Sequence, residues 1–151
     1  MAALTAAARS DVDRLVLWEP VVEGRQYIEQ SLAAHKAWNE AFRVWRLAPQ
    51  ASAPTDHPEV LGFPLTDAMR RTVSSVDLSA LTRTAPRALV VERDPAGGGR
   101  EFKDHLVNLG ARADYELVRE AEIWRSAELD QAVVPRQTLD KIVNWLSRSE
   151  S

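Results

Sequence analysis

The stretch R-A-L-V-V-E-R-D-P-A-G-G-G at residues 87–99 has the composition of a buried strand followed by a turn. Its apolar residues, two of them β-branched, give way to charged residues, a proline and three consecutive glycines. A helix is expected next, because apolar residues recur at helical spacing up to a glycine that can end it. These residues are Phe102, Leu106, Leu109 and Gly110. Strand, turn and helix in this order are typical of one unit of an α/β fold.

A second apolar run, Leu15 to Trp18, lies upstream and is bounded by charged residues and Pro20. A short strand that is apolar on both faces is what a parallel sheet covered by helices on each side requires. Residues 113–119 alternate more weakly and predict a third strand nearer an edge. Because helices separate these strands, right-handed crossovers predict a parallel sheet. The expected fold class is therefore α/β, with about three parallel strands and flanking helices.

Helices are expected over residues 2–9, from Gly24 to about Leu47, from Asp67 to about Ser75 after an N-cap at Thr66, and from about Pro135. The second has an apolar stripe formed by Tyr27, Ser31, Ala34, Trp38, Ala41, Phe42 and Trp45. The last has the stripe Leu139, Ile142, Val143 and Leu146, which predicts a helix packed on a core through those side chains. The polar stretch from Gln50 to Glu59, with prolines in and beside it, predicts a surface loop.

Composition excludes several classes of partner. The 151 residues fit one domain, and 45% hydrophobic with 27% charged residues is a globular composition. A net charge of -3 without long runs of like charge gives no reason to expect nucleic acid. The sequence has neither a signal-like start nor a long apolar stretch, so no membrane partner and a cytoplasmic location are expected. Basic residues that are almost all arginine suggest a GC-rich bacterial genome.

Asp94 is the most interesting single residue, because it directly follows a buried strand at the end where parallel sheets place catalytic groups. A turn residue before proline is the simpler interpretation, and spacing alone favours it. Gly97 to Gly99 could hold a phosphate at a helix N-terminus, but they match no phosphate-binding motif and are read as a turn. Trp38 and Trp45 could line an apolar pocket, although packing is the favoured interpretation.

Metal and cofactor sites are not expected. The three histidines, His35, His57 and His105, do not cluster, and no pair of them has metal-ligand spacing. The sequence contains no cysteine.

Five segments together resemble the α/β-hydrolase superfamily, and within it the serine aminopeptidase-like esterases and thioesterases found beside bacterial exosortase genes. They are V-D-R-L-V-L-W-E-P-V at 12–21, G-R-Q-Y at 24–27, G-F-P-L-T at 62–66, V-D-L at 76–78 and A-L-V-V-E-R-D at 88–94. The resemblance implies one domain, 1–151, in which residues 1–19 and 86–151 form the sheet layer and residues 20–85 a helical cap-like insertion. It also implies that Asp94 is the triad acid.

The departures from this family concern catalysis. The sequence has no G-x-S-x-G elbow, and Glu120 to Gln131, where the resemblance places the triad histidine, contains no histidine. Glu120, Glu122 and Glu128 could orient a group, but none replaces an imidazole as the base. The first hypothesis is a hydrolase shortened by gene truncation or a misplaced start and inactive alone. The complete protein would hydrolyse a carboxylic ester or thioester through a serine.

The second hypothesis is a non-catalytic binding or homo-oligomeric assembly protein. In it, the cap and the exposed edge of the strand at Leu15 recruit a partner or a second copy, because an unpaired edge is a pairing template. A third hypothesis, in which Asp94 and a neighbouring glutamate act as acid and base, depends on geometry that the residue pattern does not supply.

Overall fold

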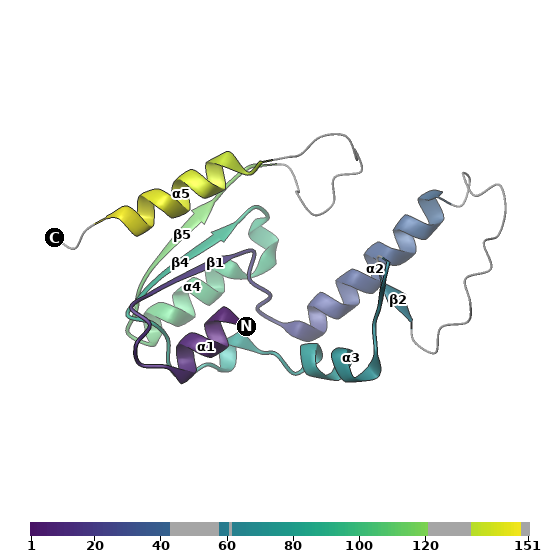
Figure 1. The fold of residues 1–151 in the computed structure, drawn as a ribbon, viewed down its shortest axis with the longest axis horizontal. Helices are drawn as coiled ribbons and strands as arrows, with labels where there is room; N and C mark the ends of the chain where they lie inside the picture. Colours follow the sequence, from purple (N-terminus) through teal and green to yellow (C-terminus); the bar gives the residue numbers. More distant parts are fainter. Residues whose placement is uncertain (43–57, 61, 121–133, 149–151) are drawn as a thin grey trace. The chain divides into compact units, whose positions relative to one another are not determined.

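The computed structural model describes residues 1–42, 58–60, 62–120 and 134–148. The chain divides into two compact units (Figure 1), a sheet unit of Met1–Val22 with Leu78–Ser151 and an inserted unit of Glu23–Asp77. The sheet unit contains α1 (Ala2–Ala8), β1 (Arg14–Trp18), η1 (Leu78–Ala80), β4 (Arg87–Glu92), η2 (Pro95–Gly97), α4 (Gly99–Asn108), β5 (Arg112–Leu117) and α5 (Arg136–Ser147). The inserted unit contains α2 (Gly24–Phe42), β2 (Glu59–Val60), β3 (Phe63–Pro64) and α3 (Asp67–Ser74).

The sheet is three-stranded, parallel and ordered β1-β4-β5, which confirms the predicted α/β class and the edge position of the third strand. Its central strand β4 is the most buried element, since residues 88–92 are at most 2% exposed. Register places Leu17, Val90 and Tyr115 side by side across the three strands. Among the described residues, β1 has no strand neighbour other than β4.

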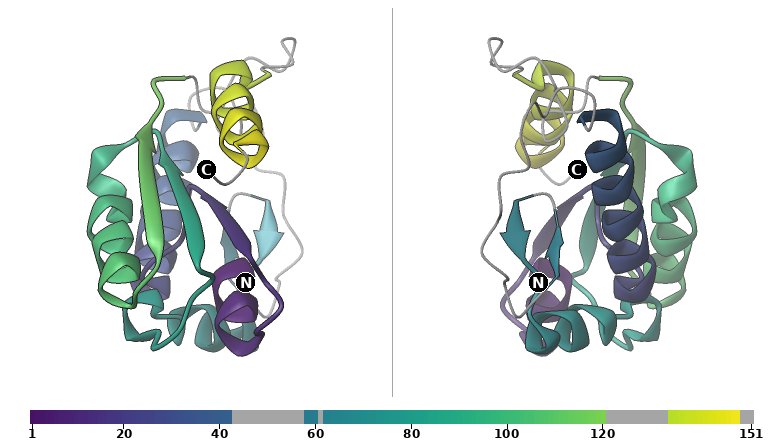
Figure 2. Two further views of the ribbon diagram at one scale, coloured as in Figure 1. Left: turned by 90° about the vertical axis from the view of Figure 1, so that its left-hand side faces the viewer. Right: turned by 90° about the vertical axis from the view of Figure 1, so that its right-hand side faces the viewer.

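Helices cover both faces of the sheet. Side chains at the same register point to the same side, so Leu89 and Asp114 belong to one face while Val90 and Tyr115 belong to the other. α5 covers the first face, where Trp145 packs with Leu89 and Val91. α4 covers the second face, and Figure 2 shows the two helices on opposite sides of the strands. Two covered faces explain why β1 and β4 are apolar apart from their charged terminal residues.

The buried face of α5 is not the predicted one. Leu139, Val143 and Leu146 are exposed, although their spacing predicted packing on the core, and only Ile142 of that stripe lies partly against it. Thr138 and Trp145 are the buried side chains of the helix. The expectation was wrong because polar contacts, which hydrophobic periodicity ignores, determine how the helix is rotated on the sheet.

Those contacts come from the strands beneath α5. The Trp145 indole donates a hydrogen bond to Oδ2 of Asp114 at 2.6 Å, and Arg87 lies over the indole ring with its guanidinium 5.5 Å from the centroid. At the end of the helix, Arg14 donates to the carbonyl oxygens of Leu146 at 2.6 Å and Arg148 at 3.3 Å. A cation at these last carbonyls complements the negative end of the helix dipole.

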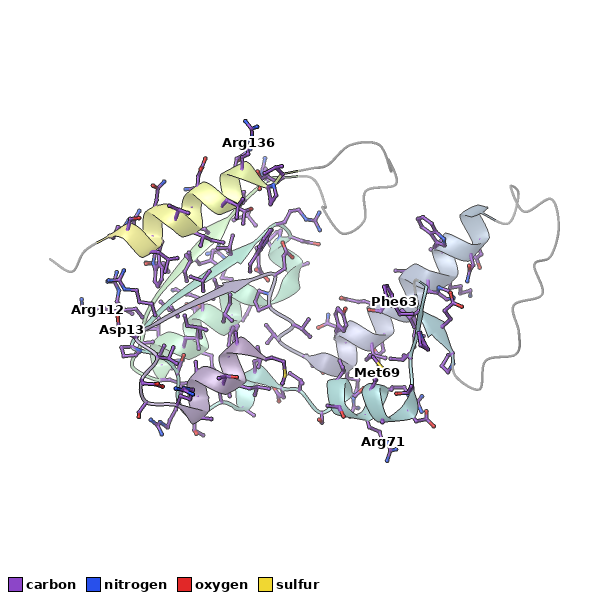
Figure 3. The ribbon with its side chains drawn as sticks, viewed as in Figure 1. Asp13, Phe63, Met69, Arg71, Arg112 and Arg136 are labelled. Carbon is purple, nitrogen blue, oxygen red and sulfur yellow. The ribbon has the colours of Figure 1, made fainter. Side chains whose placement is uncertain are left out.

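The strands begin at one charged edge of the sheet. Register aligns the first residues of the three strands, Arg14, Arg87 and Arg112, and Figure 3 shows Asp13 and Arg112 at that end. Asp13 forms an ion pair with Arg14 at 3.5 Å, and its carbonyl accepts a hydrogen bond from the backbone of Arg87. The carboxyl ends of the strands lie at the opposite edge, which is where parallel sheets place their ligand sites.

The inserted unit begins and ends at one place. Glu23 and Asp77, its first and last residues, form an antiparallel bridge, and the backbone of Gly24 donates to the carbonyl of Val76 at 2.8 Å. Gly24 also allows close packing of α2 on α3, because a Cβ there would lie 1.7 Å from the carbonyl oxygen of Val73. The two ends of the inserted unit are therefore adjacent, as expected for an insertion into the sheet unit.

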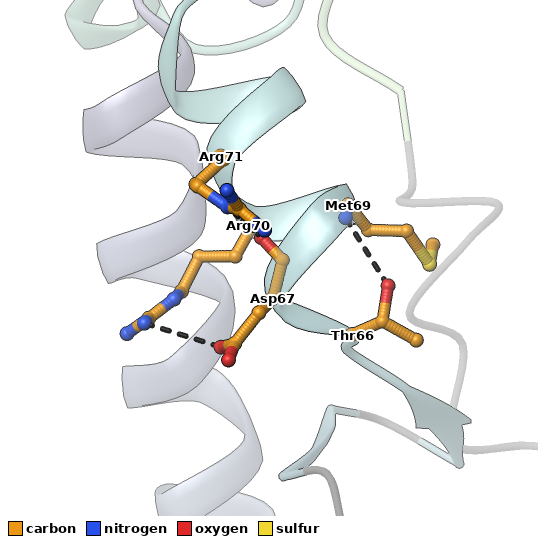
Figure 4. Close-up of polar contacts among 5 residues, drawn as sticks. All are labelled: Thr66, Asp67, Met69, Arg70 and Arg71. Atoms are coloured by element: carbon orange, nitrogen blue, oxygen red, sulfur yellow. Dashed lines mark hydrogen bonds and ion pairs between the residues drawn. The ribbon is translucent and has the colours of Figure 1, made fainter.

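α3 begins where the sequence predicted. The Thr66 hydroxyl accepts a hydrogen bond from the backbone of Met69 at 3.1 Å, and Asp67 in the first turn pairs with Arg70 at 3.3 Å (Figure 4). Before this cap lies a two-stranded antiparallel hairpin that was not predicted, in which Val60 pairs with Phe63. Most of the predicted loop, residues 50–57, lies outside the described residues.

The apolar stripe predicted for α2 is only partly right, because Ser31 and Ala34 of that stripe are half-buried. Tyr27 and Trp38 are about half exposed, whereas Ile28, which lies off that stripe, is buried. Trp38 therefore does not pack in a core as expected. The side chains of the stripe beyond Trp38 lie outside the described part of the structure. The more buried side of α2 carries Ile28, Ser31 and Ala34, and α2 packs on α3 closely at Gly24.

Candidate functional site

Acidic side chains gather at the carboxyl edge of the sheet. Glu19 follows β1, Glu92 ends β4, and Asp94 lies two residues further on. Because the strands are parallel and in register, these ends meet at one edge. Tyr115 of β5 is opposite Val90, two residues before the end of β4, and its hydroxyl reaches Glu92. We name Glu19, Glu92, Asp94 and Tyr115 the carboxyl-edge cluster.

Glu92 is the buried member of this cluster, with 2% of its surface exposed. Its Oε1 accepts a hydrogen bond of 2.7 Å from the backbone N–H of Gly99, and its Oε2 accepts one of 3.1 Å from the Tyr115 hydroxyl. Burial raises the pKa of Glu92, hydrogen bonds from Gly99 and Tyr115 lower it, and the charges of Glu19 and Glu101 raise it again. The net pKa lies above the ordinary value of a glutamate.

The glycine run makes room for this carboxylate. A Cβ on Gly99 would lie 2.3–2.6 Å from the carboxylate atoms of Glu92, and one on Gly97 would lie 2.6 Å from Oε1. Gly98 has a φ of 82°, a conformation that other residues adopt only with strain. The Glu92 carboxylate therefore accepts from the first N–H group of α4, at the end of the helix that favours negative charge. The interpretation of these glycines as a turn agrees with this geometry.

Tyr115 is held from two sides. Its hydroxyl donates to Glu92, and the guanidinium of Arg100 lies over its ring, 4.6 Å from the centroid. Burial, together with the charge and hydrogen bond of Glu92, raises the pKa of Tyr115. The phenol therefore stays protonated and available as a donor at neutral pH.

Glu19 ties the first strand to the connection after β4. Its Oε1 accepts a hydrogen bond of 2.7 Å from the backbone of Arg93, and its own N–H donates to the carbonyl of Val91 at 2.9 Å. Its φ of 48° is left-handed, the only such value at a non-glycine residue in the described part of the chain. Strained backbone of this kind is often found at functional sites.

Asp94 lies at the predicted position and is exposed to solvent. Its Oδ1 accepts a hydrogen bond of 2.9 Å from the backbone of Ala96, so the side chain caps the short η2 turn before Pro95. This contact agrees with the interpretation of Asp94 as a turn residue. An exposed carboxylate can orient a histidine side chain. However, the segments that follow the three strands, residues 19–22, 93–98 and 118–120, contain neither histidine nor serine.

The other residues singled out in the sequence lie elsewhere. His105 makes a 2.9 Å hydrogen bond with the carbonyl of Leu81, and His35 bonds Asn39 within α2. Glu120 accepts hydrogen bonds from Thr138 and Gln137 at the start of α5, so it caps that helix. His57, Trp45, Glu122 and Glu128 lie outside the described residues.

Neither a metal centre nor a membrane helix is found in the part of the chain that the structure describes. No group of three His, Cys, Asp or Glu side chains there could hold a metal ion. No helix among the same residues is long and apolar enough to cross a bilayer.

Glu92, Tyr115 and Glu19 were missed by sequence reasoning. A glutamate that ends an apolar strand before three glycines is a signal that could have revealed Glu92, because glycine is also used where other atoms approach the backbone closely. Tyr115 and Glu19 gave no comparable signal.

Comparison with protein-family models, curated proteins and solved structures found no match to this chain. A functional assignment therefore depends on the fold class and on the geometry of the carboxyl edge.

Proposed function

We propose that this chain is an α/β-hydrolase-like protein that is inactive alone and acts by binding a further strand along β1. The observation that carries the proposal is the pairing of β1. Leu15 and Leu17 are buried and the strand is apolar in the manner of an interior strand, yet among the described residues it pairs only with β4. The backbone groups on its other side are a template for a strand of a partner or a second copy.

A second copy fits this edge in a specific register. An antiparallel β1–β1 pair centred on Val16 would place Arg14 of each copy opposite Trp18 of the other, on the same face of a continuous six-stranded sheet. The same register places Leu15 of each copy opposite Leu17 of the other, so the apolar side chains of the two strands meet across the pair. A homodimer is therefore the occupant that the residues of β1 favour.

The hydrolase part of the proposal rests on Asp94 and on the resemblance of the strands around it. Asp94 is exposed at the carboxyl end of the central strand, the position at which the resemblance implies the triad acid. An ester or thioester is the substrate class that the resemblance implies for the complete family member. The chain's own sequence has no G-x-S-x-G elbow, so the isolated protein is expected to be inactive.

The inserted unit has the apolar side chains that an acyl ligand would need. Phe63 of β3 is 74% exposed and Met69 of α3 is 51% exposed (Figure 3). Tyr27, Leu32 and Trp38 of α2 are also exposed. An acyl chain would bind where such side chains lie together in one patch.

The test measures mass and activity on the same sample. Size-exclusion chromatography with light scattering over a hundredfold dilution is expected to show a dimer that dissociates, and p-nitrophenyl acetate and butyrate are expected to give no turnover above buffer. A monomer at every concentration would contradict association between copies. Turnover abolished by Asp94→Ala would contradict inactivity.

A variant pair makes the test specific for β1. Val16→Lys would place two ammonium groups opposite each other at the two-fold axis, and the long lysine stem can reach solvent from this half-buried position. Val16→Thr keeps the shape and is the matched control. We expect the lysine variant to be monomeric and the threonine variant to remain a dimer. A dimer that survives Val16→Lys in a folded protein would place the interface elsewhere.

A further inference from the structure

One buried carboxylate joins three consecutive elements of the sheet unit. Glu92 ends β4, and its two oxygens accept from Gly99 at the start of α4 and from Tyr115 of β5. Residues 93–98 connect β4 to α4. The side chain of Glu92, just before this connection, hydrogen-bonds to Gly99, just after it. At the start of the connection, the backbone of Arg93 donates to Glu19.

The groups around Glu92 have opposite effects on the ionisation of its carboxyl group. The N-terminus of α4 and the donors Gly99 and Tyr115 favour a negative charge on the carboxylate. Burial disfavours it, as do two further carboxylates, Glu19 after β1 and Glu101 in the first turn of α4. Arg100, beside Glu101 in α4, has its guanidinium over the Tyr115 ring. Asp94, in the connection, has its carboxylate turned to Ala96.

We infer that Glu92 is a proton-operated latch on the connection that carries Asp94, closed when its carboxyl group is neutral and loosened when it loses the proton. A neutral carboxyl keeps both contacts, because it can accept from Gly99 and share its own proton with the Tyr115 hydroxyl. A charged Glu92 carboxylate would be buried near two other carboxylates, Glu19 and Glu101, when the connection is closed. When the connection is open, water would reach the carboxylate and stabilise its charge. Closing is therefore coupled to proton uptake.

The direction of the effect follows from the pKa of Glu92, which is raised in the closed state. Protons bind the closed connection more tightly than the open one, so falling pH favours closure and rising pH favours opening. Each unit by which the closed-state pKa exceeds the open-state pKa changes the ratio of the two states by about tenfold. Since β4 stays paired on both sides, opening affects residues 93–98 and the first turn of α4. This inference does not depend on association through β1.

Amide hydrogen exchange of the full-length protein, followed by NMR between pH 4 and pH 8, tests the latch at Gly99. After correction for the intrinsic rate, we expect the protection of the Gly99 amide in the wild type to fall with rising pH. In Glu92→Gln, which keeps the shape and cannot ionise, the protection is expected to be independent of pH. Glu101→Gln is the control on the same helix, and it should retain the pH dependence with a lower midpoint.

Two results would overturn the latch. The first is a Gly99 protection in the wild type that does not change with pH, or that changes equally in Glu92→Gln. The second is an NMR titration of the Glu92 carboxyl carbon in the wild type that shows ionisation at or below the ordinary range of a glutamate. This measurement does not require the glutamine variant to fold.

Discussion

The indole N–H of Trp145 donates a 2.6 Å hydrogen bond to Oδ2 of Asp114, which joins the last helix to the edge strand of the sheet. Trp145 is buried, and its ring also packs on Leu89, Val91 and Val118. Asp114 itself is exposed, so the bond matters chiefly to the buried donor. This one contact determines which side of α5 faces the sheet.

Removing the acceptor should destabilise the fold. Asp114→Ala leaves the buried indole N–H without its acceptor, which costs ~1–3 kcal/mol of unfolding free energy. Asp114→Asn retains a carbonyl oxygen and should cost less. Urea unfolding followed by tryptophan fluorescence measures both, with exposed Asp140→Asn in the same helix as the control. Equal losses in the alanine and asparagine variants would mean that the hydrogen bond contributes little.

Glu92 should make the protein less stable as pH rises. Its pKa is raised in the folded state, so its contribution is fully present below the pKa of the unfolded chain and is lost as pH rises through the folded-state pKa. In Glu92→Gln, the free energy of unfolding should therefore depend less on pH in this range. The variant should become more stable relative to wild type as pH rises to neutral. Denaturant midpoints measured at half-unit steps from pH 4 to pH 8 provide the check. A constant difference between the two proteins across this range would refute the linkage.

Glu120 should show the opposite dependence. Burial raises its pKa, but the hydrogen bonds from Thr138 and Gln137 outweigh this, so the folded-state pKa is lowered. Its contribution is present above the unfolded-state pKa and is lost as pH falls through the folded-state pKa. We expect Glu120→Gln to be less stable than wild type at pH 7 and equal to it in acid, in the same denaturant series. Arg119→Gln at the neighbouring exposed position is the control.

Gly99 and Glu92 should be coupled energetically. Gly99→Ala puts a methyl group into the Glu92 carboxylate and should destabilise the fold, whereas in a Glu92→Ala background the methyl group has room. A double-mutant cycle is expected to give a coupling of ~1–3 kcal/mol. Gly62→Ala, where the strain comes from a φ of 89° and not from a neighbouring atom, is the comparison and should show no coupling. Additive effects of the first pair would argue against close contact.

The inserted unit should be removable. Because Gly24 and Val76 are joined by a backbone hydrogen bond, Asn-Gly in place of residues 25–75 should close a two-residue hairpin. The shortened protein is expected to unfold cooperatively and to keep the upfield methyl resonances of Leu89 and Val91 near Trp145. Replacement by a long Gly-Ser linker controls for strain in the turn. Loss of those resonances in both proteins would show that the sheet unit needs the insertion.

Several elements of the fold could be predicted because their signals are local. Leu15 to Trp18 and Arg87 to Val91 are strands, since a short apolar run that is buried on both faces has few other solutions. Thr66 starts α3 and the glycine at 110, with its φ of 92°, follows the end of α4. Even the parallel pairing follows from the alternation of strands and helices.

The candidate site was only half predictable. Asp94 could be located because its position depends on the end of a strand, which is a local property. Its contact with Ala96 is also local and agrees with the turn interpretation, whereas the burial of Glu92 depends on how α4 returns to the sheet. A glutamate in a sequence is read as exposed, because charged residues are seldom buried without partners. Here the partners, Gly99 and Tyr115, are 7 and 23 residues away.

The sequence by itself determined that this protein is an α/β layer with two apolar interior-type strands, because strand burial and helix ends are encoded within a few neighbouring residues. Only the tertiary structure decided that Trp145 and not the stripe of Leu139, Val143 and Leu146 faces the sheet, and that Glu92 closes the connection bearing Asp94. The physical reason is the same in both cases. Hydrophobic periodicity records where the apolar side chains lie around a helix, whereas the hydrogen bonds of Trp145 and Glu92 join residues that only the folded chain brings together.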